Sequence, residues 1–395
     1  MKQKLRRSRR SVFGKRRTHP ALKALLWIVV CVAVVSAGFF GAKWMTEGPS
    51  VQDTSVGDSA TPDTPSKGNT NDDQPVKPED AKPSVDTPAI TESIRAFYLP
   101  VSELSVDTLS ETSTLQNAAK AGFNAVIFDL KDADGTLYYQ FADSRAKKTA
   151  AYAANALTAD NVKALFAMMR EAGLQPIPRL YAFCDDPAAK VLTDARIGLE
   201  SNHTWAWYDG DPNNGGKKWL NPYAPAAQEY IGALADELKA QGAAAIMLDG
   251  VQFPTQLSSA YLGEEAATVS KADALSAFVS AMRTRLGDDC PLLLGCTGKG
   301  ALATDTKEYG GNPLTFGPSA AAPQLTSKVK ESVEAMLLRL QVLTDKPDLV
   351  PMLMMEDATA KEANAAISAC VAGGTDSFIL VLPEGDYDFA AYTLP

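Results

Sequence analysis

The sequence predicts a (β/α)8 barrel of the TIM type over residues 93–395. Three observations favour it: short apolar runs recur along these residues, longer amphipathic stretches separate them, and several of those stretches end at a glycine. Apolar runs without strict alternation are typical of strands buried on both faces, as in a parallel sheet. A doubly wound open sheet is the alternative, but no GxGxxG motif follows an early strand.

The apolar runs predict seven strands, and a weaker run supplies an eighth where one is needed. In chain order the strands are expected at Ile94–Leu99, Ala125–Leu130, Pro176–Ala182, Ala244–Leu248, Pro291–Cys296, Asn312–Gly317 (the weak one), Leu349–Met355 and Ser377–Leu382. Helices are expected between them, at Val106–Ala121, Ala159–Ala172, Ala224–Gln241, Lys271–Leu286, Ser327–Leu343 and Ala360–Ala372. Eight strand–helix units in about 300 residues suit a closed barrel.

A different organisation is predicted before the barrel. Residues 1–23 form a basic tail without acids, and residues 24–43 contain an apolar run about long enough to cross a bilayer as a helix. Since basic flanks stay in the cytoplasm, this anchor would place the rest of the chain outside. A cleaved signal peptide is the alternative, because Val35–Gly38 resembles a cleavage site, but the apolar run continues beyond it.

Residues 44–92 are rich in Pro, Ser, Thr, Asp and Lys and contain almost no large apolar side chains. Such a segment cannot bury enough surface to offset its ordering entropy, so a disordered linker is expected. The predicted location is the cell membrane, crossed once, with the N-terminus cytoplasmic and the barrel extracytoplasmic.

The charge of the predicted exported part narrows the choice of partner. The first 43 residues hold 11 Lys or Arg and no acid, which leaves 27 basic and 47 acidic residues in the remainder. A net charge of about −20 there argues against nucleic acid as a partner.

The sequence also excludes several kinds of catalytic site. Only His19 and His203 occur, which excludes an HExxH or His-rich metal site, and neither GxSxG nor a phosphate-binding loop is present. No CxxC spacing occurs among the four cysteines of the predicted exported part, Cys184, Cys290, Cys296 and Cys370. We therefore expect no metal and no cofactor.

Carboxylates stand at the carboxyl ends of several predicted strands, where the active site of a barrel gathers. Asp129 lies at the end of the second strand, Asp249 of the fourth and Glu356 of the seventh. Glycoside hydrolysis needs two such acids, although each is also a common loop or capping residue. Asp249 is the strongest candidate, because its neighbours Leu248 and Val251 are apolar and a charge in that company costs free energy.

Candidates for substrate binding surround these acids. The polar segment 201–219 is rich in tryptophan, whose flat rings suit stacking against sugars, although the same rings could pin the loop to the barrel. The candidates are Lys131, Arg179, Tyr181, Gln252, Trp205, Trp207 and Trp219.

Four segments together resemble a family of glycoside-hydrolase-like barrels from bacterial exported proteins, distantly related to amylase-like barrels. They are NAVIFDLKDADG (124–135), PIPRLYAFCDDPAAK (176–190), WLNPYAPAAQEYIGALADEL (219–238) and AIMLDGVQFP (245–254). The resemblance covers about residues 93–390. It implies a barrel that acts on a polysaccharide or cell-envelope glycan, with Asp249 at the position of the nucleophile.

The chain departs from the family pattern at three places. Gly250 and Gln252 stand where the family has an aromatic residue and an arginine, and the fifth strand ends without the acid of amylase-like enzymes. Glu356 is the best substitute for that general acid, and Asp129 the next. Three hypotheses follow: a hydrolase with Asp249 as nucleophile or electrostatic stabiliser, an inactive glycan-binding or scaffold module, and an assembly partner of envelope synthesis.

Overall fold

The computed structural model describes residues 93–303, 306–326, 333–343, 347–383, 385 and 387–395. The predicted tail (1–23), transmembrane anchor (24–43) and linker (44–92) lie outside these residues. No helix within the described ranges combines the length and the apolar character needed to cross a bilayer.

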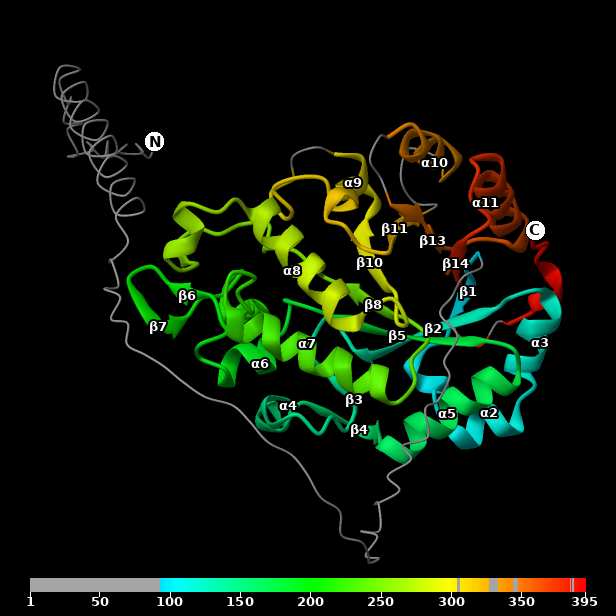
Figure 1. The fold of residues 1–395 in the computed structure, drawn as a ribbon, viewed down its shortest axis with the longest axis horizontal. Coiled ribbons are helices and arrows are strands. Elements are labelled where there is room, and N and C mark those ends of the chain that lie inside the picture. The colour runs from blue at the N-terminus through cyan, green and yellow to red at the C-terminus, as the bar shows by residue number, and fades with distance from the viewer. Residues whose placement is uncertain (1–92, 304–305, 327–332, 344–346, 384, 386) are drawn as a thin grey trace, which may run out of the picture. The chain divides into compact units, whose positions relative to one another are not determined.

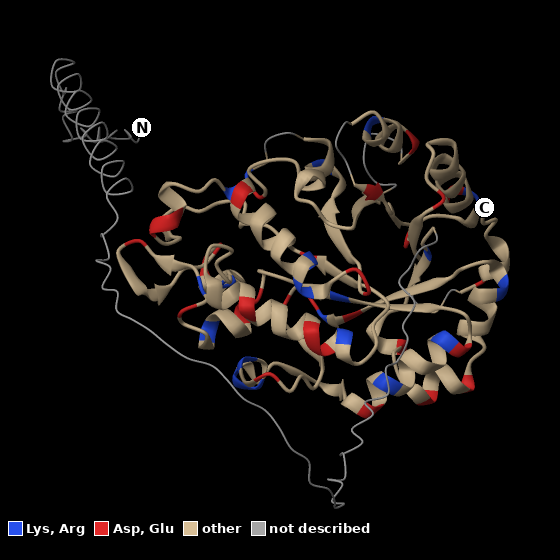
Figure 2. Ribbon diagram, viewed as in Figure 1, with Lys and Arg blue, Asp and Glu red and all other residues tan. Residues whose placement is uncertain are grey.

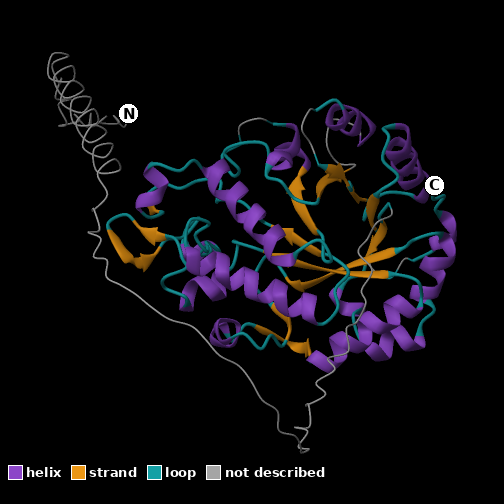
Figure 3. Ribbon diagram, in the orientation of Figure 1, coloured by secondary structure: helices purple, strands orange, loops and turns teal. Residues whose placement is uncertain are grey.

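Eight parallel strands form a closed barrel surrounded by helices (Figures 1 and 3). Each strand pairs with the next around the ring, and the last, β14, pairs with β1, which in turn pairs with β2. The predicted (β/α)8 fold is therefore confirmed. In chain order the barrel strands are β1 (Arg95–Tyr98), β2 (Ala125–Lys131), β5 (Gln175–Tyr181), β8 (Ile246–Asp249), β10 (Leu292–Thr297), β11 (Ala320–Thr326), β13 (Met352–Met354) and β14 (Phe378–Val381).

The strand predicted at Asn312–Gly317 is wrong. Pro313–Thr315 form a short 3-10 helix, η4, because the Asn312 side chain accepts a hydrogen bond from the Leu314 amide and Pro313 suits the first helical position. The sixth barrel strand is instead β11, whose sequence AAAPQLT is built mainly from small residues. Weak apolar character and an internal proline conceal it in the sequence.

The helices pack around the outside of the barrel and largely match their predicted ranges. Lys271–Leu286 (α8) and Ala360–Ala372 (α11) agree at both ends, and capping residues Ser270 and Thr359 fix their starts. The helix predicted at Val106–Ala121 is two helices. The other helices are α2 (Val106–Glu111), α3 (Thr114–Ala121), α4 (Ser144–Thr149), α5 (Ala159–Glu171), α6 (Asp186–Val191), α7 (Pro225–Ala240), α9 (Gly298–Leu302) and α10 (Val333–Gln341).

Two additions to the barrel were not predicted. An extension of two strands, β3 (Leu137–Tyr139) and β4 (Tyr152–Leu157), continues the sheet beyond β2: β3 pairs antiparallel with β2 and parallel with β4. A separate three-stranded antiparallel sheet contains β7 (Asn202–Ala206), β6 (Gly198–Leu199) and β9 (Ala260–Tyr261) in that order. Its strands come from the connections that follow β5 and β8, so this sheet belongs to the carboxyl end of the barrel.

The core has two parts that follow from the alternation of side chains along each strand. The larger lies between strands and helices, and the smaller fills the barrel with residues such as Ala96, Ile127, Ile177 and Met247. Side chains two positions further on also face inward at the carboxyl end. These side chains include Tyr98, Asp129, Arg179 and Asp249. Charged residues of both signs are otherwise interspersed over helices and loops (Figure 2).

Candidate functional site

Arg179 joins two carboxyl groups at the carboxyl end of the barrel. Its Nε lies 2.5 Å from Asp129 Oδ1 and its Nη2 lies 2.9 Å from Asp129 Oδ2, which is a bidentate ion pair. Its Nη1 lies 3.6 Å from Asp249 Oδ2. All three side chains are less than a tenth exposed. Gln252 stands where the resemblance implies an arginine, and Arg179 instead brings a cation to Asp249 from β5.

Asp249 is held by neutral donors as well as by this cation. The Gly250 amide donates to Oδ1 at 2.7 Å, and Gln324 Nε2 donates to Oδ2 at 2.9 Å. Burial raises the pKa of Asp249, while Arg179 and the Gly250 amide oppose that shift. The sequence places Asp249 among apolar neighbours. The structure adds polar contacts from Arg179 of β5 and Gln324 of β11.

Two tyrosines enclose the Arg179 guanidinium. Its carbon atom lies 5.0 Å from the ring centre of Tyr98 on β1 and 5.0 Å from that of Tyr181 on β5. Tyr98 also donates its hydroxyl to Asp129 Oδ2 at 3.0 Å. Burial raises the pKa of both tyrosines, so their hydroxyls stay neutral and act as donors. Asp129 therefore receives three hydrogen bonds.

A glycine on β10 makes room for the Asp249 carboxyl group. A Cβ atom on Gly295 would lie 2.8 Å from Asp249 Cγ and 2.9 Å from Met247 Cε, closer than such atoms pack. The missing side chain at this position therefore sets the place of the carboxyl group.

We expect Gly295→Ala to lower the free energy of unfolding by about 1–3 kcal/mol, because the added methyl group overpacks the barrel against Asp249. Urea denaturation measures the change. Gly210→Ala is the control, since its Cβ would meet its nearest neighbour at 3.6 Å. Equal effects of the two substitutions would contradict the packing argument.

Lys131, predicted to bind substrate, is instead fully buried. Its Nζ lies 3.0 Å from Asp185 Oδ2, with neither side chain exposed, and it donates to the Tyr181 carbonyl oxygen at 2.6 Å. Asp185 also accepts from the Ala188 amide at the start of α6. Solvent does not reach Lys131. Its contacts with Asp185 and the Tyr181 carbonyl oxygen instead join the end of β2 to the end of β5.

Gln252 links two loops above the barrel. Its Oε1 accepts a hydrogen bond from the Tyr309 hydroxyl at 3.1 Å, and that hydroxyl also accepts from the Thr297 amide at 3.3 Å. The neighbouring Phe253 amide donates to the Glu308 carbonyl oxygen. These contacts join the loop after β8 to the one after β10.

The three candidate tryptophans have different environments. Trp207 and Trp219 are buried, and their indole nitrogens donate to the Ser258 carbonyl oxygen and to Asp209, both at 2.8 Å. These two rings fasten the loop, as the packing alternative predicts. Trp205 on β7 is 63% exposed and remains open to a ligand.

Glu356 is exposed in the turn after β13. Among the described contacts, no hydrogen bond or ion pair joins it to Asp249. The residues that the sequence did not single out are Tyr98, Gln324 and Gly295. Tyr98 shares the inward register of Ala96, which is a signal in the sequence, whereas Gln324 lies on the strand that the pattern missed.

The described residues contain no cluster of three or more His, Cys, Asp or Glu side chains suited to a metal ion. The four cysteines in this part of the chain, Cys184, Cys290, Cys296 and Cys370, are free thiols. Burial raises the pKa of Cys184 to about 11, so this thiol is protonated at neutral pH.

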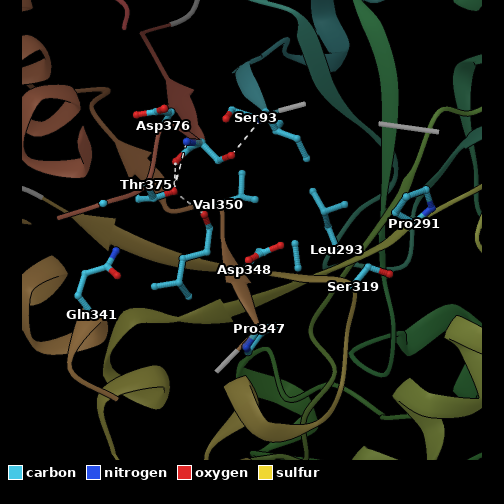
Figure 4. Close-up of a pocket in the computed structure, with 15 residues that line it drawn as sticks. Ser93, Pro291, Leu293, Ser319, Gln341, Pro347, Asp348, Val350, Thr375 and Asp376 are labelled. Carbon is cyan, nitrogen blue, oxygen red and sulfur yellow. Dashed lines mark hydrogen bonds between the residues drawn. The ribbon is translucent and has the colours of Figure 1, made fainter. Parts of the chain in front are cut away.

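A cavity of about 670 Å³ lies at the opposite end of the barrel, around the amino ends of its strands (Figure 4). Its hydroxyl groups serve the backbone: Ser377 accepts from the Ile94 amide, and Ser319 accepts from the Leu292 amide. These contacts satisfy strand starts that would otherwise lack partners. We therefore assign the chemistry to the carboxyl end.

Several solved structures are similar to this chain. A hypothetical protein from Ruminiclostridium thermocellum is 21% identical, with a TM-score of 0.42 over 50% of this chain and 96% of that one. An α-galactosidase from Thermus thermophilus is 14% identical, with a TM-score of 0.48 over 78% and 60%. The glycoside hydrolase domain of PelA from Pseudomonas aeruginosa is 15% identical, with a TM-score of 0.41 over 73% and 94%.

No curated protein matches the chain. Residues 96–295, half of the sequence, match the family described as a "putative glycosyl hydrolase domain". The match begins in β1 and ends in β10, and it includes Asp129, Arg179 and Asp249. The resemblance inferred from the four sequence segments is thereby confirmed, and the chain belongs to this glycosyl hydrolase domain family.

Proposed function

We propose that the barrel is a glycoside hydrolase acting on a polysaccharide, with Asp249 and Asp129 as its two carboxyl groups. The observation that supports this most is the guanidinium of Arg179, which contacts both groups at the end of the barrel where active sites of this fold lie. Two carboxyl groups, one donating a proton and one facing the sugar cation, are what glycoside hydrolysis requires.

Asp249 is assigned the proton transfer. Because burial raises its pKa, its carboxyl group is suited to carry a proton to the glycosidic oxygen as the bond between that oxygen and the sugar carbon breaks. Asp129 receives three hydrogen bonds, which suits a carboxylate that stabilises the positive sugar until water adds to the sugar carbon and gives its proton to Asp249. We therefore propose Asp129, rather than Glu356, as the second catalytic carboxyl group.

We expect Asp249→Asn to reduce the release of reducing ends, from a polysaccharide that the wild-type chain hydrolyses, by at least about 10³-fold, since the proton donor is lost. Asp129→Asn should also inactivate, and Glu356→Gln is the matched control that should retain activity. Loss of activity in Glu356→Gln with activity kept in Asp129→Asn would overturn the pairing.

Asp249→Asn should at the same time raise the melting temperature at pH 7 by about 1–3 °C. The raised pKa means that folding favours the protonated carboxyl group, so the wild type loses stability as the pH rises through the folded pKa. Asparagine does not ionise. The advantage of the variant should therefore shrink as the pH falls toward the ordinary aspartate value of 3.8. Calorimetry at several pH values measures it.

A second candidate function is glycan binding without cleavage. It is favoured by the end of β10, which carries Cys296 and Thr297 and no acid, and by the full set of donors around Asp129. Saturable binding of a polysaccharide from which no reducing ends are released would favour this function over hydrolysis.

We also propose that the barrel is held at the outer face of the cell membrane by residues 24–43. The support is the apolar run behind a basic flank and the polar linker that follows. Recovery of the full-length chain from membranes by detergent but not by high salt tests this location.

A further inference from the structure

We infer that the β6–β7–β9 sheet carries a second glycan-binding surface, formed by His203, Trp205 and Tyr261. The class of ligand rests on the proposed function, whereas the surface is separate from the Asp249 site and can be tested without it.

Two aromatic rings stack face to face on this sheet. The rings of His203 on β7 and Tyr261 on β9 stack with their centres 3.4 Å apart and their planes within 4°. They come from the two outer strands, with β6 between them. Gly198 on β6 lets the β7 backbone approach closely, because a Cβ there would lie 2.8 Å from the His203 carbonyl oxygen. The Tyr261 hydroxyl also donates to Glu264 at 3.1 Å, which fixes the ring.

Trp205 adds a third ring to the same sheet. Trp205 is 63% exposed. Trp207, directly after β7, is buried, and its indole nitrogen donates a hydrogen bond to the Ser258 carbonyl oxygen, which holds the end of this strand in place. An exposed indole on a fastened strand loses little conformational freedom when it stacks on a ligand. This combination is typical of a recognition surface.

A groove of about 290 Å³ lies beside the stacked rings and sets the chemistry of the ligand. It is lined by His203 and Tyr261 together with Asp194, Arg196 and Glu265. Side chains of both signs around a small groove suit the hydroxyl groups of a sugar, which both donate and accept hydrogen bonds, better than they suit an anion or an apolar peptide. Ring faces beside such groups favour a pyranose chain.

The position of the sheet relates it to the candidate active site. β6 and β7 follow β5, which carries Arg179, and β9 follows β8, which carries Asp249. Figure 1 shows β6 and β7 beyond the ends of β5 and β8. The surface therefore belongs to the same end of the barrel, where it would retain a polysaccharide during successive cleavages.

The test is isothermal titration of the full-length Asp249→Asn chain with cellohexaose, chitohexaose, maltohexaose and xylohexaose. We expect at least one to bind at two sites per chain. Trp205→Ala and Tyr261→Ala, each added to this background, should remove one site or weaken it at least tenfold. Leu338→Ala, which removes an exposed apolar side chain on α10, should change nothing.

The outcomes separate this inference from the proposed function. One site that is lost with Trp205→Ala would support the surface while counting against binding at Asp249. Binding that neither Trp205→Ala nor Tyr261→Ala alters would overturn the surface, and so would the absence of binding to all four oligosaccharides. Circular dichroism of each variant excludes unfolding as the cause of a lost site.

Discussion

Arg179→Met is expected to lower the free energy of unfolding by about 3–5 kcal/mol and to abolish hydrolysis. The substitution leaves Asp129 and Asp249 buried without the cation that both contact, and an unpaired buried charge is costly. The loss should be greater at pH 8 than at pH 4, because burial raises the pKa of Asp249 and protonation removes its unpaired charge at low pH. Urea denaturation at the two pH values measures it.

Arg179→Lys is the matched control for this prediction. Lysine keeps the charge but cannot donate two parallel hydrogen bonds to Asp129, so its loss of stability should be intermediate. If Arg179→Met cost less than about 1 kcal/mol at both pH values, the arginine would not hold the two carboxyl groups as described.

Lys131→Met is expected to cost a similar amount, about 3–5 kcal/mol, because it strands Asp185 in a fully buried position. The double variant Lys131→Met/Asp185→Asn should recover most of the loss. Asparagine is neutral and can still accept the Ala188 amide hydrogen bond at the start of α6. Chemical denaturation of both single variants and the double variant gives the coupling energy.

A small coupling energy between Lys131 and Asp185 would contradict this reading of the pair. A large coupling energy together with loss of hydrolysis in Lys131→Met would indicate that the pair also positions Tyr181. The Tyr181 carbonyl oxygen accepts a hydrogen bond from Lys131 Nζ.

Much of the barrel could be predicted because most of its strands are recognisable from their local composition. Runs such as AVIFDL and SFILVL are apolar on both faces, as a strand between a barrel interior and a helix layer must be. β11 could not be found this way, because Ala320 and Ala322, which face the barrel interior, are small residues whose fit only the assembled ring defines. The β6–β7–β9 sheet joins segments about 60 residues apart, and pairing at that distance leaves little local signal.

The sequence indicated several residues of the candidate site but not the contacts between them. Asp129, Arg179 and Asp249 each stand near the end of an apolar run, which the sequence shows. That Arg179 pairs with both acids depends on the neighbouring positions of β2, β5 and β8 in the ring. The same geometry separates Lys131 from the other candidates: it is only two positions beyond Asp129, yet it pairs with Asp185 and is buried.

The pairing of β14 with β1 has a consequence for biosynthesis. The Ile94 amide, next to β1, bonds to Ser377, next to β14, across 283 positions of sequence. A ribosome therefore releases nearly all of the domain before the ring can shut, and until then β1 and the newest strand present open edges. Residues 96–295 supply only the strands from β1 to β10, so a recombinant fragment cut to the family match would keep those edges and aggregate.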